Sequence, residues 1–188
     1  PSEDTLSVRV KLRTGRLDDA RAILETWAEQ EREQLHAPRA IRETLLILSL
    51  IYSMQGDARQ AYESAQQSIE LGARFDSPFV TGVGYMRLGH ANQIRGELRA
   101  ALDAYQQAVA LTPADSSKRP MYLNNWGKGL LERYARLGSL ADLERALELY
   151  QQAVALTPED SPDRPDRLNN WGNAMSDRFA RLGSLADL

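Results

Sequence analysis

A repeat of 45 residues constrains this chain more than any other feature of its sequence. Residues 101–143 and 146–188 align without gaps, and 30 of the 43 aligned positions are identical. Three segments recur unchanged at this offset: YQQAVALTP from Tyr105, LNNWG from Leu123 and ARLGSLADL from Ala135. A fixed period of about 20–50 residues is the signature of arrays whose units pack against their neighbours. The sequence therefore predicts a repeat array.

The N-terminal half repeats the same skeleton more loosely. A glycine is followed five residues later by an alanine three times, at Gly15, Gly56 and Gly96. Ser49 and Gly89 stand seven residues before the two later glycines, where small side chains would let two helix backbones approach closely. We expect Gly56 and Gly96 to end helices in the left-handed conformation that a C-terminal cap requires.

Apolar spacing indicates that the repeats are built from helices. Leu98, Leu102 and Tyr105 follow the three- and four-residue rhythm of an amphipathic helix. Pro113 and Pro158 are expected to stop the second helix of their repeats. The pattern predicts paired helices at 4–14 and 16–34, 39–55 and 57–72, 78–95 and 97–112, 120–137 and 140–157, and a ninth helix at 165–182.

These signature positions resemble those of the tetratricopeptide repeat (TPR) family. The best-matched repeat carries Tyr85, Leu88, Gly89, Gly96, Ala101, Tyr105, Ala108 and Pro113. The resemblance covers essentially the whole chain and implies an all-α, right-handed superhelix with four full repeats and a truncated fifth. In one array, the repeats would span about 1–36, 39–72, 78–113, 119–158 and 164–188. Because the 45-residue units exceed the 34-residue family length, the standard curvature is not assumed.

The resemblance also implies a binding surface, because first helices line the inner groove in this family. Carried over, the apolar groove positions are Leu46, Ile47, Leu50, Met54 and Met86. The candidate partner-binding residues are Arg87, His90, Gln93, Asn124, Asn125, Lys128, Asn169, Asn170 and Asn173. Paired asparagines have poor helix propensity, which favours a hydrogen-bonding role toward an extended peptide. Alternatively, duplication alone accounts for them, because two near-identical repeats share residues whether or not they are useful, and both interpretations stay open.

The sequence offers no recognisable catalytic, cofactor or metal site. It contains no cysteine, and its two histidines, His36 and His90, lie in different repeats without metal-binding spacing. We therefore expect a protein that is not an enzyme and has no cofactor. Repeat-spaced arginines are accompanied by acids and the net charge is −3, which argues against nucleic-acid binding. The longest apolar stretch, 45–52, is too short for a membrane span.

These observations favour a protein-interaction scaffold that holds a protein or peptide partner, with a cytoplasmic location. The alternative is a sensor domain that binds a small-molecule effector. GRLDDARAILETWAEQ and QGDARQAYESAQQSIELG resemble the sensor arrays of large bacterial STAND-type ATPase regulators, including LuxR-family proteins of the maltose-activator type. The 45-residue repeats resemble arrays in bacterial proteins with NTPase or caspase-like (CHAT) domains. We expect a fragment of a longer protein, and self-association through the partial fifth repeat is left open.

Overall fold

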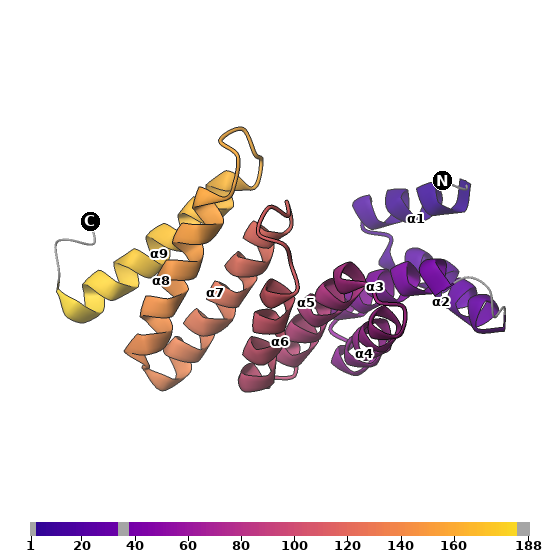
Figure 1. Cartoon of the computed structure of the whole chain (residues 1–188), viewed down its shortest axis with the longest axis horizontal. Helices are drawn as coiled ribbons and strands as arrows, with labels where there is room; N and C mark the ends of the chain where they lie inside the picture. Colours follow the sequence, from indigo (N-terminus) through magenta and orange to yellow (C-terminus); the bar gives the residue numbers. More distant parts are fainter. Residues whose placement is uncertain (1–2, 34–37, 184–188) are drawn as a thin grey trace. The chain divides into compact units, whose positions relative to one another are not determined.

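The computed structural model describes residues 3–33 and 38–183 of the chain, and all regular structure in these ranges is helical (Figure 1). The helices are α1 (Glu3–Arg13), α2 (Leu17–Glu33), α3 (Pro38–Gln55), α4 (Ala58–Arg74), α5 (Pro78–Ile94), α6 (Leu98–Ala110), α7 (Arg119–Leu137), α8 (Leu140–Ala155) and α9 (Arg164–Leu182). Where the predicted helix ends fall within the described ranges, they agree with these bounds to within two residues. The all-α fold class is confirmed.

Helix ends form where the sequence predicts them. Gly56 and Gly96 both adopt a φ of 77°, so the left-handed caps expected after α3 and α5 are confirmed. Asp57 then caps α4, because its side chain accepts a hydrogen bond from the main-chain N–H of Gln60 over 3.1 Å. In the described ranges, no helix combines the length and apolarity that a bilayer crossing requires.

The chain divides into two compact units, and the first comprises residues 1–97. Within this unit, each helix packs against the next one along the chain, and α3 also contacts α5. Their core includes Leu24, Ile51 and Ala61, all at most 1% exposed. The hydroxyl of Ser49 donates to the carbonyl of Ala61 over 2.8 Å. The close helix approach predicted at Ser49 is therefore confirmed.

The second unit comprises residues 98–188, and its described part contains α6 to α9. Here α7 packs against α6 and α8, α8 packs against α9, and α7 also contacts α9. Tyr105 and Tyr150 are fully buried at equivalent positions of α6 and α8. A Cβ added to Gly127 would lie 2.8 Å from Cε1 of Tyr150, so this glycine lets α7 approach α8 closely. The boundary between the units falls inside the predicted repeat 78–113.

Candidate partner-binding site

The two LNNWG segments lie on contacting helices of the second unit. Asn124 and Asn125 lie in the second turn of α7, and Asn169 and Asn170 lie in the second turn of α9. The Nδ2 group of Asn170 donates to Oδ1 of Asn124 over 3.0 Å. The separation is 46 residues, one more than the repeat. The hydrogen bond therefore joins the second asparagine of one repeat to the first asparagine of the preceding one.

The asparagines and lysine predicted to bind a partner differ in their exposure. Asn169, Asn173 and Lys128 are exposed and Asn125 is half-buried. Asn124 is only 8% exposed, so it supports this face by holding Asn170. We call Asn169, Asn170, Asn173, Asn125 and Lys128 the amide face; it occupies the surface of α7 and α9 that their mutual contact brings together.

The predicted groove residues of the first unit form a separate group on α5. Arg87, His90 and Gln93 recur every third residue and are half-buried, and each has an interaction partner. The prediction is wrong for Leu46 and Met86, which are 7% and 1% exposed. These large apolar side chains pack into the helix interfaces and line no open groove.

Three arginines that the sequence reasoning missed hold the ends of helices together. Arg119 donates through Nη1 to the carbonyls of Val109 and Thr112, and Arg164 makes the equivalent contacts one repeat later. Helix C-termini leave carbonyls without intrahelical partners, which these guanidinium groups satisfy. Arg167 is 7% exposed and donates to the hydroxyl of Thr157 over 2.7 Å. The Arg-Pro pair repeated at 45 residues was the available signal for the first two.

The arginines that recur near the ends of α7 and α9 are paired with acids. Arg133 forms a bidentate ion pair with the buried Asp142, with distances of 2.7 and 2.6 Å. These hydrogen bonds raise the pKa of Arg133. Arg178 contacts Glu144 over 3.2 Å. These two arginines are therefore structural groups that join neighbouring helices.

The groups of the described ranges that could carry metal or acid–base chemistry are histidine, aspartate, glutamate and tyrosine side chains. No cluster of three or more histidine, aspartate or glutamate residues there could hold a metal, and His36 lies outside the described residues. Burial raises the pKa of Tyr105 and Tyr150, which keeps both phenols neutral. Tyr52 behaves likewise, because burial and the hydrogen bond from its hydroxyl to Glu25 raise its pKa.

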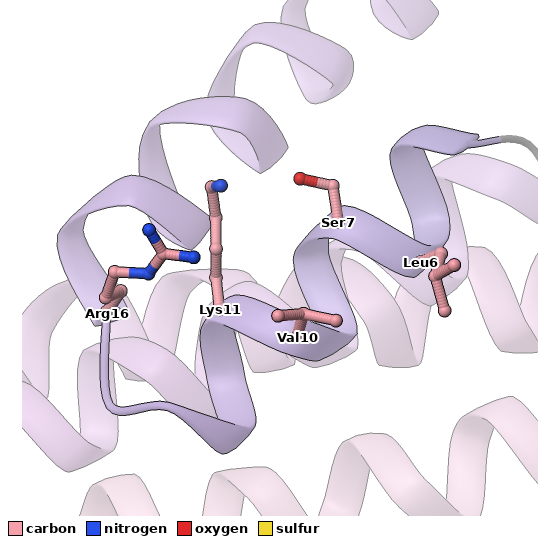
Figure 2. Close-up of a pocket in the computed structure, with 5 residues that line it drawn as sticks. All are labelled: Leu6, Ser7, Val10, Lys11 and Arg16. Atoms are coloured by element: carbon pink, nitrogen blue, oxygen red, sulfur yellow. The ribbon is translucent and has the colours of Figure 1, made fainter.

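A shallow hollow lies beside α1 (Figure 2). Its lining residues are Leu6, Ser7, Val10, Lys11 and Arg16. Leu6 and Val10 are 62% and 44% exposed, and the two cations stand near the turn that leads into α2. The hollow thus combines the hydroxyl of Ser7 with two cationic side chains.

Comparisons with known proteins agree with this architecture. A family model described as tetratricopeptide repeat matches residues 84–115, and no curated protein matches the chain by sequence. A Podosopora anserina protein described as a kinesin light chain with nearly identical TPR-like repeats is 18% identical, with a TM-score of 0.73 over 95% of this chain and 86% of its own.

Two further solved structures share the fold. BtubC (BKLC) from P. vanneervenii is 15% identical, with a TM-score of 0.77 over 98% of this chain and 73% of its own. A MamA protein is 22% identical, with a TM-score of 0.62 over 96% of this chain and 83% of its own. The repeat match and these structures together support a TPR-type array of helix pairs.

Proposed function

We propose that the chain is a protein-interaction scaffold whose amide face holds an extended peptide segment of a partner protein. The observation that carries the proposal is the Asn170–Asn124 hydrogen bond, which joins two first helices beside the exposed Asn169, Asn173 and Lys128. The TPR-type fold supports the same class of function, because stacked helix pairs present extended surfaces suited to binding.

The chemistry of the amide face suits a peptide backbone. Each asparagine side chain offers both a donor and an acceptor, as each peptide unit does. Asn169 and Asn173 are four residues apart and therefore neighbours on one side of α9. Lys128 stands at the repeat position of Asn173 and adds one positive charge, which favours a partner segment that carries a carboxylate.

Burial and hydrogen bonding of the asparagines bear on whether they bind a partner or were inherited by duplication. Asn124 and Asn170 hydrogen-bond each other, so a structural role accounts for both of them. Asn169 and Asn173 are exposed, and a partner would explain two unfavourable residues on a helix surface. Asn169 and Asn173 are therefore the residues whose substitution tests partner binding.

Selection from a displayed library of random 12-residue peptides against the full chain supplies the probe. The enriched peptide is synthesised and its affinity measured by fluorescence anisotropy. We expect the Asn169→Ala/Asn173→Ala variant to bind it at least about tenfold more weakly, since two hydrogen bonds are lost. The matched control is Gln151→Ala/Gln152→Ala, which removes two exposed amides from the second helix α8.

Equal affinities for the wild type and the asparagine variant would overturn the proposal, because the peptide would then bind elsewhere. Loss of affinity only in the glutamine variant would place the site on α8. The sensor role in a larger bacterial regulator, its small-molecule effector and the cytoplasmic location stay predictions from the sequence.

A further inference from the structure

One stripe of α7 is covered by α8. Leu123, Gly127, Leu130 and Tyr134 follow one another at four- and three-residue spacing and therefore share a side of the helix. Leu123 and Leu130 are 1% and 4% exposed. The ring of Tyr150 lies against Gly127, within 2.8 Å of where a Cβ would stand. Apart from the half-buried Tyr134, this side of α7 is thus packed against the second helix of its own repeat.

The equivalent stripe of α9 is only partly covered in the described part of the chain. It consists of Leu168, Gly172, Met175 and Phe179, which are the residues 45 positions after those of α7. Leu168 is 43% exposed, against 1% for Leu123. No atom lies within 4 Å of a Cβ added to Gly172. The same leucine and the same glycine are therefore buried in one repeat and open in the next.

The opposite side of α9 already has its partner. Ala174 is fully buried, and Arg178 contacts Glu144 of α8, so α9 is docked in the array through the side that faces the preceding repeat. The open stripe is the second side of a helix whose position is otherwise set. The exposed Leu168 and the open space at Gly172, beside the half-buried Met175 and Phe179, indicate a surface that another element can cover.

Polar residues beside the stripe also recur. The guanidinium of Arg145 on α8 lies 5.1 Å from the ring centroid of Trp126, and Trp171 stands at the equivalent position of α9. Asp142, near the start of α8, pairs with Arg133, whose equivalent is Arg178. Arg178 already contacts Glu144, so the group that an incoming helix would meet is Trp171, through an arginine at the position of Arg145.

We infer that the open stripe of α9 binds an amphipathic helix with the sequence pattern of α8. In α8 the covering side is made by Leu143, Ala146, Tyr150 and Ala153, all at most 1% exposed. Two observations identify this occupant: α8 itself covers the duplicate stripe on α7, and residues 183–188 read GSLADL, as do residues 138–143 that lead into α8. Gly172 leaves the slot that a tyrosine ring fills at Gly127.

The test uses the full chain and a fluorescein-labelled synthetic peptide of residues 138–158, followed by fluorescence anisotropy. We expect saturable binding that Gly172→Leu weakens about tenfold or more, because the leucine fills the slot for Tyr150 of the peptide. Asp177→Leu places the same side chain at an exposed position of α9 outside the stripe and the amide face, and we expect it to leave the peptide affinity unchanged. A peptide that carries Leu143→Asp and Tyr150→Asp should not bind.

A second test links the helix covalently to the chain, which avoids the entropic cost of bringing two molecules together. Residues 144–158 are appended after Leu188, and we expect the Tm to rise by about 5 °C relative to the same extension with aspartates at its leucine and tyrosine positions. An unchanged Tm, or peptide binding that Gly172→Leu does not affect, would overturn the inference. A dimer of the chain that Gly172→Leu dissociates in sedimentation would also overturn it, because a second copy would then be the occupant. The amide face takes no part in these assays, so their failure leaves the proposed function intact.

Discussion

The substitution of Gly127 and Gly172 by alanine should have opposite effects although both glycines occur in the same LNNWG segment. Glycine inside a helix is about 0.5–1 kcal/mol less favourable than alanine, and this gain applies equally to both sites. At Gly172 nothing lies within 4 Å of the new Cβ. Gly172→Ala should therefore raise the free energy of unfolding by about 0.5–1 kcal/mol.

At Gly127 the new Cβ would lie 2.8 Å from Cε1 of Tyr150 and 3.1 Å from Cδ1 and Cζ. The ring is 1% exposed, so it cannot swing into solvent. Overpacking of this kind typically costs about 1–3 kcal/mol, which exceeds the helix-propensity gain. Gly127→Ala should thus lower the free energy of unfolding by about 1 kcal/mol. Because the propensity gain cancels between the variants, their difference measures the clash alone.

Urea unfolding followed by circular dichroism gives both values. Gly129→Ala is the matched control: its Cβ would meet Cδ2 of Leu102 at 2.9 Å, which is the movable end of a side chain, and the equivalent residue one repeat later is Ala174. We expect this variant to change stability by less than about 0.5 kcal/mol. Equal stability changes for Gly127→Ala and Gly172→Ala would refute the close α7–α8 packing.

Three further predictions follow from individual contacts. A double-mutant cycle of Asn124→Ala and Asn170→Ala should give a coupling free energy of about 0.5–1.5 kcal/mol in urea unfolding, and a coupling of zero would show that the two amides do not bond. The pKa values of Tyr105 and Tyr150 are raised in the folded state above the ordinary value of 10.0, so the unfolded chain releases these protons first. These two groups should leave the stability unchanged below about pH 10 and should lower it above that pH. Between pH 8 and 11.5 the Tm of Tyr150→Phe should therefore fall less steeply than that of the wild type, and an unchanged slope would contradict this. Arg133→Gln leaves the buried Asp142 without its ion-pair partner and should lower the free energy of unfolding by about 1–3 kcal/mol. Arg136→Gln is the control: its pair with Glu132 is more exposed, so the free energy of unfolding should change by less than about 0.5 kcal/mol. Similar losses in a thermal melt of both variants would argue against the Asp142 pair.

The helices could be predicted from the sequence because their ends depend on local chemistry. Gly56 and Gly96 adopt a positive φ, which glycine tolerates more readily than other residues, so the residue type itself predicts the helix end. Asp57 accepts a hydrogen bond at the start of α4, which is a local role that aspartate commonly has at this position. The close approach at Ser49 followed from its small size at a repeated position.

The binding surface could be predicted only in outline, because exposure depends on the neighbouring helix. Asn124 and Asn169 occupy the same position of the LNNWG segment, yet one is buried and the other exposed. The difference arises because, in the described residues, only Asn124 has the first helix of a following repeat beside it. Met86 occupies a groove position by family resemblance but packs into the core. Arg167 replaces the buried Tyr122 of the preceding repeat, and its partner Thr157 lies on another helix, which no local pattern reveals.

The amide face requires α7 and α9 to lie side by side with their asparagine pairs in register. Because the chain contains no cysteine, Asn124→Cys with Asn170→Cys introduces two unique thiols for a short bifunctional maleimide. We expect this pair to cross-link within one molecule. Asn124→Cys with Asp177→Cys, about 10 Å further along α9, should cross-link far less. Equal yields for the two pairs, or no cross-link in the first, would contradict the shared amide face.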